Sequence, residues 1–93
     1  QDRFVEGSLK LARCLDGKES LPWLTRLIER VPSVEEGYQL LMKRQYQGGD
    51  RALALRTFER CAENLSLELD VPVSPETERL YQGILAQADP HSL

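Results

Sequence analysis

Apolar residues recur at steps of three and four along most of this chain, which is the spacing of amphipathic α-helices. The expected helices cover residues 2–15, 20–31, 33–48, 50–69 and 75–88. In the fourth of them, one stripe is formed by Leu55, Phe58, Ala62, Leu65 and Leu69, with Ala54 and Cys61 as small neighbours. Leu, Ala, Glu, Arg and Gln are abundant, and these residues favour helices. The pattern therefore predicts an all-α fold.

Residues that start and stop helices separate the middle segments. Gly48-Gly49 ends the third helix, and the side chain of Asp50 can cap the fourth. Ser74 is placed to cap the last helix, with Pro75 in its first turn, where a missing amide hydrogen costs little.

Two earlier helix starts are predicted in the same way. Ser20 is expected to cap the second helix, so that Pro22 falls in its first turn. Ser33 and Glu36 have the spacing of a capping box, which predicts the start of the third helix.

The chain contains an internal repeat, in which each unit is a helix, a turn and a second helix. The matched pairs are Phe4 with Tyr38, Asp16 with Asp50, Leu21 with Leu55, Leu24 with Phe58 and Leu27 with Cys61. The two residues of every pair are separated by the same number of positions, and this separation is the period typical of tetratricopeptide repeats. In such repeats each helix pair covers the bare face of the next pair. We therefore expect a right-handed tetratricopeptide-like stack of antiparallel pairs. A single domain is expected over residues 1–88, followed by a flexible tail over 89–93.

Composition and charge narrow the class of protein. Hydrophobic residues make up 41% of the 93 residues and charged residues 29%, as in an ordinary globular domain. No apolar run approaches the ~20 residues of a membrane-spanning helix, so no membrane partner is expected. Residues 1–62 contain 11 Lys/Arg and 9 Asp/Glu, whereas residues 63–93 contain 1 and 6. Neither part has the dense basic face of a phosphate-binding protein. The start Gln1-Asp2-Arg3, without Met, suggests a piece of a longer protein.

The sequence offers no evident catalytic or cofactor site. The single histidine, His91, falls in the expected tail, and Gly48-Gly49 lacks the lysine of a phosphate-binding loop. Cys14 and Cys61 lie within apolar helical patterns without CxxC spacing. We interpret them as packed thiols of a cytoplasmic protein, with a disulfide or a metal site as the alternative. Our expectation is therefore a non-catalytic domain without a metal or cofactor.

Residues 35–86 contain a distinctive series of residues: Tyr38, Leu41-Met42, Gly49-Asp50-Arg51, Ala54-Leu55-Arg56, Phe58-Glu59-Arg60, Leu65, Glu68-Leu69, Ser74-Pro75-Glu76-Thr77 and Leu80-Tyr81. With this series, the segment resembles the bacterial transcriptional activator domain. Residues 1–34 match only as a degenerate helical repeat, and the linker Asp70-Val71-Pro72-Val73 departs from the family pattern. The resemblance implies a tetratricopeptide-like module of a regulator of the antibiotic regulatory protein type. In such proteins a separate N-terminal domain binds DNA, while this module binds protein or forms dimers.

Tetratricopeptide-like stacks usually bind partners on the concave face, which the first helix of each pair lines. The candidate residues there are Arg13, Gln39, Lys43, Tyr46 and Gln47. Lys43 and Tyr46 could hold an acidic or amide-rich segment by charge and stacking. For each residue alone, a solvated surface with a half-packed tyrosine is the alternative interpretation.

Two further features point outward from the expected core. Trp23 falls off the apolar stripe of its helix, so it either covers a seam between helices or faces a partner. Arg56 and Arg60 lie four residues apart and could contact DNA phosphates, or pair with Glu59 and Glu63 as ordinary surface charges. Direct nucleic-acid binding by the more basic first two-thirds of the chain is therefore the alternative to a protein-binding function.

Overall fold

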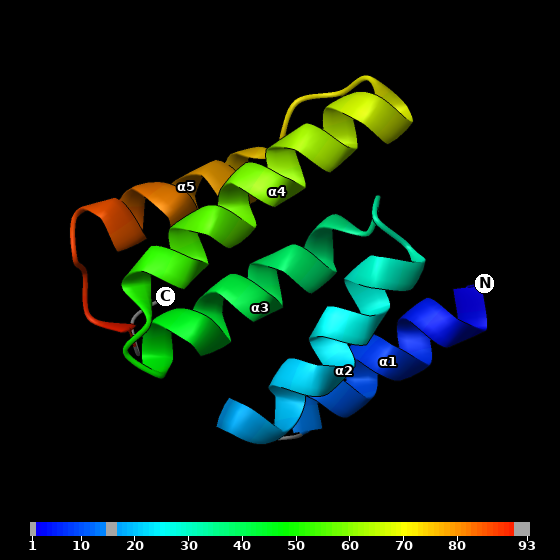
Figure 1. The fold of residues 1–93 in the computed structure, drawn as a ribbon, viewed down its shortest axis with the longest axis horizontal. Helices are drawn as coiled ribbons and strands as arrows, with labels where there is room; N and C mark the ends of the chain where they lie inside the picture. The colour runs from blue at the N-terminus through cyan, green and yellow to red at the C-terminus, as the bar shows by residue number, and fades with distance from the viewer. Residues whose placement is uncertain (1, 15–16, 91–93) are drawn as a thin grey trace.

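Five α-helices build the computed structural model, which describes residues 2–14 and 17–90 (Figure 1). They are α1 (Asp2–Cys14), α2 (Gly17–Arg30), α3 (Glu35–Gln47), α4 (Arg51–Leu69) and α5 (Pro75–Leu85). Leu15, Asp16 and the tail residues 91–93, including His91, lie outside the described residues, as does the side chain of Cys14. The expected all-α fold is confirmed.

Helix α3 is the centre of the arrangement. It packs against α2 and α4, its neighbours in sequence, and it also contacts α1 and α5. Figure 1 shows α3 between the α1–α2 pair and the α4–α5 pair. Contacts between consecutive helices, together with contacts between alternate ones, are those of a tetratricopeptide-like stack. Helices α1, α3 and α5 therefore share one face of the stack, and we call it the first-helix face.

The internal repeat of the sequence is visible in the packing. Ser20 in α2 and Ala54 in α4 occupy equivalent positions of the repeat, and both are completely buried. Leu27 and Cys61 form a second pair of equivalent, completely buried positions. Small residues at positions 20 and 54 let each second helix lie close to its neighbours. The repeat is thus structural as well as statistical.

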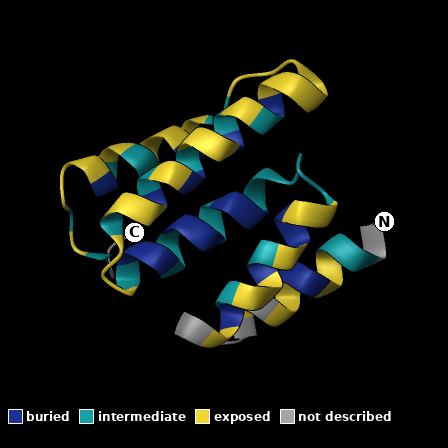
Figure 2. Cartoon of the chain, viewed as in Figure 1, coloured by how far each residue is buried: buried dark blue, intermediate teal, exposed yellow. Residues whose placement is uncertain are grey.

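The core has two parts that meet on α3. The first joins α2, α3 and α4 through Leu24, Ile28, Tyr38, Leu41, Cys61 and Leu65. The second joins α3, α4 and α5 through Met42, Tyr46, Ala54, Leu80 and Ile84. Figure 2 shows the consequence, because α3 is largely buried while the outer sides of α4 and α5 are exposed. Both parts of the core therefore depend on α3.

The predicted caps of the last two helices are confirmed. The Asp50 side chain accepts a hydrogen bond from the Leu53 amide at 3.1 Å, and Ser74 accepts one from the Thr77 amide at 3.4 Å. Gly49 has a φ of 90°, a left-handed conformation that suits glycine, and it closes the turn between α3 and α4. These local signals were reliable because each side chain acts on its own helix.

The predicted start of the second helix was wrong. Helix α2 begins at Gly17, so Ser20 lies inside the helix and does not cap it. Pro22 consequently lies beyond the first turn, on the exposed side of α2. The burial of Ser20 explains the difference, because this small residue is used at a helix contact, as Ala54 is in the next repeat.

The predicted capping box of the third helix was also wrong. Helix α3 begins at Glu35, its N-cap is Val34, and no side chain caps it. Glu36 instead forms an ion pair with Arg13, and Ser33 lies in the turn before the helix. Glu36 therefore interacts with a residue of another helix and not with the start of its own helix.

The buried stripe of α4 differs from the predicted one, because it runs through the expected small neighbours Ala54 and Cys61 and its predicted last residue is exposed. Leu69 is 54% exposed, and the buried line of α4 runs through Ala54, Thr57, Cys61 and Leu65. Phe58 is half-buried beside this line and stacks on Tyr81, with ring centroids 3.9 Å apart. The register of α4 is therefore rotated slightly from the predicted one.

Helix α5 ends at Leu85, before the predicted end at residue 88. Gln87 has a left-handed φ of 57°, and the Ala88 amide donates to the Gly83 carbonyl at 2.9 Å, which closes the helix. The side chain of Arg51 donates to the carbonyls of Ile84 and Leu85, so α4 supplies a cation to the carboxyl end of α5. Residues 86–90 then turn back toward the end of α3.

Candidate interaction surface

An open groove of about 480 Å³ lies beside α1 on the first-helix face. Its walls are Glu6, Gly7, Leu9, Lys10 and Arg13 of α1 and Glu36 of α3. We call it the α1–α3 groove. Arg13 and Glu36 form an ion pair, so one of the predicted site residues ties α1 to α3. A β-carbon placed on Gly7 would have no atom within 4 Å, so the groove is open at that point.

Lys43 extends this surface along α3. It lies two helical turns after Glu36, which places both side chains on the same side of the helix. Lys43 is half-buried and has no hydrogen bond or ion pair with the described residues, and Lys10 likewise has none. Two ammonium groups are therefore available to a partner along the α1–α3 groove.

The other predicted residues of this face are engaged within the chain. Gln39 donates to the Thr77 hydroxyl at 2.7 Å, and Gln47 donates to the Pro90 carbonyl at 3.5 Å. Tyr46 is 9% exposed, and its hydroxyl donates to the Ala88 carbonyl at 2.5 Å. Helix α5 and the segment after it thus cover the part of α3 that these residues occupy. These three residues therefore do not belong to the open surface.

A polar cluster of Glu35, Gln39, Ser74 and Thr77 holds the start of α5 against α3, and we call it the α5 clamp. One Glu35 carboxylate oxygen accepts from the Ser74 amide at 2.7 Å and from the Thr77 hydroxyl. Burial by itself raises the pKa of Glu35, but the hydrogen bonds from Thr77 and Ser74 together lower the pKa by more than burial raises it, so the net shift is downward. The α5 clamp therefore favours a charged carboxylate.

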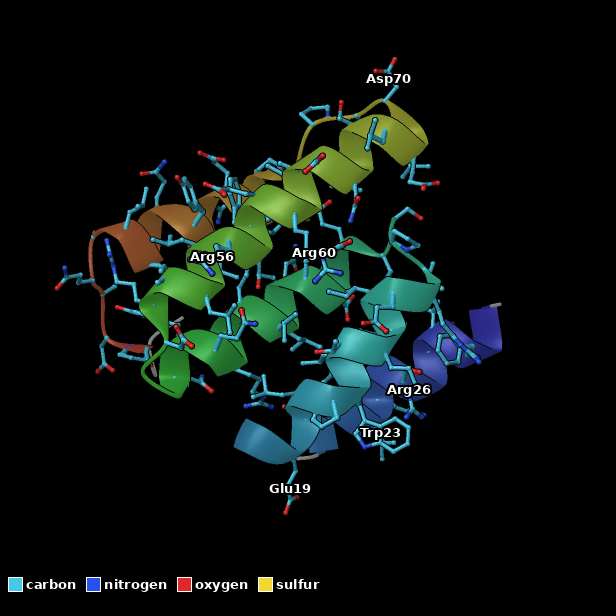
Figure 3. All side chains as sticks on the ribbon, viewed as in Figure 1. Glu19, Trp23, Arg26, Arg56, Arg60 and Asp70 are labelled. Atoms are coloured by element: carbon cyan, nitrogen blue, oxygen red, sulfur yellow. The ribbon has the colours of Figure 1, made fainter. Side chains whose placement is uncertain are left out.

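Trp23 lies on the outer side of α2, where it is 39% exposed. The guanidinium of Arg26 lies over its ring, 5.6 Å from the ring centroid. Figure 3 shows the two side chains together at the edge of the molecule formed by α2. Trp23 is therefore a surface aromatic and not part of the core.

Arg56 and Arg60 are exposed on α4 and have no ion pair or hydrogen bond among the described residues (Figure 3). Glu59 and Glu63 are exposed on the same helix, so positive and negative charges alternate there. A stripe of mixed sign attracts phosphates weakly.

One comparison with known proteins decides the family. The model of the bacterial transcriptional activator domain matches residues 3–85. The chain belongs to the bacterial transcriptional activator domain family. The match includes α1 and α2, where the sequence had shown only a degenerate repeat. No curated protein and no solved structure matches the chain.

In this activator domain, Cys61 is a free and fully buried thiol. Desolvation and the nearby Glu35 carboxylate raise the pKa of Cys61 to about 12. The thiol is therefore protonated at neutral pH, whereas a nucleophile or a metal ligand needs the thiolate. Among the described residues, no group of His, Cys, Asp and Glu side chains could hold a metal ion, and no described helix could cross a membrane.

The sequence had not singled out Glu6, Gly7 and Lys10 as residues of this surface. A usable signal was present, because Glu6, Lys10 and Arg13 follow each other at helical steps on the polar side of α1. Placing them beside Glu36 required the crossing of α1 and α3, which no local pattern specifies.

Proposed function

We propose that this activator domain is a non-catalytic protein-binding module of a bacterial transcriptional regulator, working in the cytoplasm. The α1–α3 groove receives the partner, which is a sister domain of the regulator, a second copy or another protein. The observation that carries the proposal is this open groove on the first-helix face, with Lys10 and Lys43 free of internal partners among the described residues. Contact with DNA is then indirect, through a separate domain of the regulator.

The chemistry of the groove favours an extended segment that carries an acidic side chain. In the wall of the groove, Gly7 leaves open space and Leu9 adds an apolar side chain. Lys10 adds an ammonium group next to them. Lys43 lies further along α3 on the side of Glu36. Carboxylates placed near these two lysines gain charge-assisted hydrogen bonds without breaking any contact inside the domain.

The competing function is direct nucleic-acid binding through residues such as Arg56 and Arg60. A salt titration with duplex DNA separates the two functions. We expect no binding tighter than about 100 μM for residues 1–93, the weak end of non-specific protein–DNA affinities. Replacing Arg56 and Arg60 with Glu should leave that weak signal nearly unchanged.

Tight binding to duplex DNA would contradict the proposed function. Sub-micromolar binding that falls by about 10³-fold between about 50 and 200 mM salt would indicate many phosphate contacts. Such a result, abolished by the Arg56→Glu/Arg60→Glu change, would replace the protein-binding function with nucleic-acid recognition.

A further inference from the structure

A second surface with a distinct chemistry lies on the outer side of α2. Trp23, Arg26 and Arg30 follow each other at steps of three and four, which places them on one stripe of the helix. The Arg26 guanidinium lies 5.6 Å from the Trp23 ring centroid, and the Arg30 guanidinium lies 5.4 Å from the Phe4 ring centroid. We call these four residues the α2 ladder.

The α2 ladder is arranged for an anionic partner with apolar character. Arg26 and Arg30 are exposed and have no carboxylate partner among the described residues. Contact with the aromatic rings holds both guanidinium groups in place while their polar edges stay free for carboxylates. Trp23 adds a half-exposed aromatic surface, and tryptophan is enriched in binding hot spots. Glu19, one turn before Trp23, is the acidic residue on this stripe.

The complementary chemistry occurs at the far end of α4. Residues 67–71 are all exposed, and apolar and acidic side chains alternate among them. Leu67 is 76% exposed, Leu69 is 54% exposed and Val71 is 42% exposed, with Glu68 and Asp70 between them. We call this segment the α4 tip. Its charge is opposite in sign to that of the α2 ladder, and its apolar side chains suit the exposed ring of Trp23.

The two surfaces cannot meet within one molecule. Figure 3 shows Asp70 at one edge of the molecule and Trp23 with Arg26 at the opposite edge. Figure 2 shows the end of α4 as exposed, away from the packed sides of α3. Each surface is therefore open to a contact from another molecule.

We propose that the α4 tip of one copy docks on the α2 ladder of a second copy. Glu68 and Asp70 would pair with Arg26 and Arg30, while the leucines of the tip would cover Trp23. This contact deepens the proposed function by naming a second copy as a partner. It rests on that function only in that the domain binds protein, and it uses a surface separate from the α1–α3 groove.

Such a contact is heterologous, because different surfaces of the two copies meet. A heterologous contact leaves one free surface at each end of a dimer, so association continues to a closed ring or an open chain. The average mass should therefore rise beyond that of a dimer as the protein concentration increases. Because the contact depends on exposed charges, added salt should weaken it.

The experiment exchanges charge between the two surfaces. One variant carries Arg26→Glu with Arg30→Glu, which makes the ladder acidic. The other carries Glu68→Lys with Asp70→Asn, which makes the tip basic and keeps a residue that tolerates the left-handed φ of 54° at position 70. Each variant alone then meets like charges and should associate at least about tenfold more weakly in sedimentation equilibrium.

An equimolar mixture of the two variants should restore association, because each ladder now finds a tip of opposite charge in the other variant. The control is Arg56→Glu with Arg60→Glu, which makes the same charge change at the same spacing on α4 and should behave like the unmodified chain. Trp23 is the only tryptophan, so its emission should shift with association. Trp23→Gln should weaken association without changing the helical circular dichroism.

Three outcomes would overturn the inference. These are a chain that stays monomeric at all concentrations, a mixture that fails to associate although both variants are folded, and a control that loses association. A shift in Trp23 emission caused by duplex DNA, without self-association, would assign the α2 ladder to nucleic acid instead. If the chain self-associates but no partner binds at the α1–α3 groove, only the proposed function of the groove is overturned, and the contact between copies stands.

Discussion

Replacing Tyr38 with alanine should destabilise the domain by about 3–5 kcal/mol, the usual cost of removing a buried aromatic ring. Tyr38 is completely buried in the first part of the core. Its hydroxyl donates to the Pro32 carbonyl at 2.9 Å and accepts from the side-chain amide of Asn64 at 2.7 Å. One side chain thus joins the α2–α3 turn, α3 and α4. Urea denaturation, followed by circular dichroism, measures the loss.

The matched control is Tyr38→Phe, which keeps the ring and removes the hydroxyl. Two hydrogen bonds are lost, and the Pro32 carbonyl and Asn64 amide lose a partner, so we expect a cost of about 1–2 kcal/mol. Equal costs for the two variants would mean that the hydroxyl contributes all of the stability. A cost below about 1 kcal/mol for Tyr38→Ala would contradict the central position of this ring in the core.

The second large effect concerns the α5 clamp. Glu35→Ala should cost about 2–3 kcal/mol, because it removes two hydrogen bonds to a charged carboxylate and leaves the buried Thr77 hydroxyl without its acceptor. The loss should be concentrated at α5, where amide hydrogen exchange should become faster than in α2. Glu76→Ala, an exposed change on α5, serves as the control. Uniform acceleration in all helices would contradict a local clamp.

The α5 clamp also predicts a dependence of stability on pH. The pKa of Glu35 is lowered in the folded chain, so its stabilising contribution is present above the carboxyl pKa of the unfolded chain, 4.5. That contribution is lost as the pH falls through the lowered folded pKa. The unmodified chain should therefore lose more stability than Glu35→Gln between about pH 6 and pH 3, in urea denaturation. Parallel pH profiles of the two proteins would exclude this role of Glu35.

Features that depend on one helix at a time were predictable from the sequence. The five helices, the caps at Asp50 and Ser74 and the turn at Gly49 follow from side chains that act within a few residues. The internal repeat added the order of packing, because equivalent residues such as Leu27 and Cys61 take equivalent places in a stack. Local helix signals and the internal repeat were together sufficient to predict the fold.

Features that depend on a choice between a local and a distant partner were not predictable. Glu36 could cap its own helix or pair with Arg13, and Ser20 could cap α2 or fill a helix contact. Tyr46 lies at a helical position that a partner could reach, but Ala88 binds its hydroxyl. In each case the distant residue belongs to another part of the chain, and only the crossing of the helices brings it near.

The open surface differs in part from the predicted one for the same reason, because α5 and the segment after it contact α3. Gln39, Tyr46 and Gln47 were expected on the open face, and α5 with its following segment contacts all three. Arg13 lines the α1–α3 groove from α1, together with Lys10 and Gly7. Lys43 lies further along α3, on the same side of that helix as Glu36. The proposed partner site is therefore shifted from the middle of the first-helix face toward α1.

Position-specific photo-cross-linking tests the central claim, that the α1–α3 groove binds a protein partner, most directly. A photoreactive residue is placed at Lys43, on the side of α3 that carries the groove residue Glu36, or at Arg79 on the exposed side of α5 as a control. In cells that make the full regulator, position 43 should yield discrete protein adducts, and Lys10→Glu should reduce them about tenfold through charge repulsion. Position 79 should yield none. Equal adducts from both positions, or adducts from position 43 that Lys10→Glu leaves unchanged, would contradict the account.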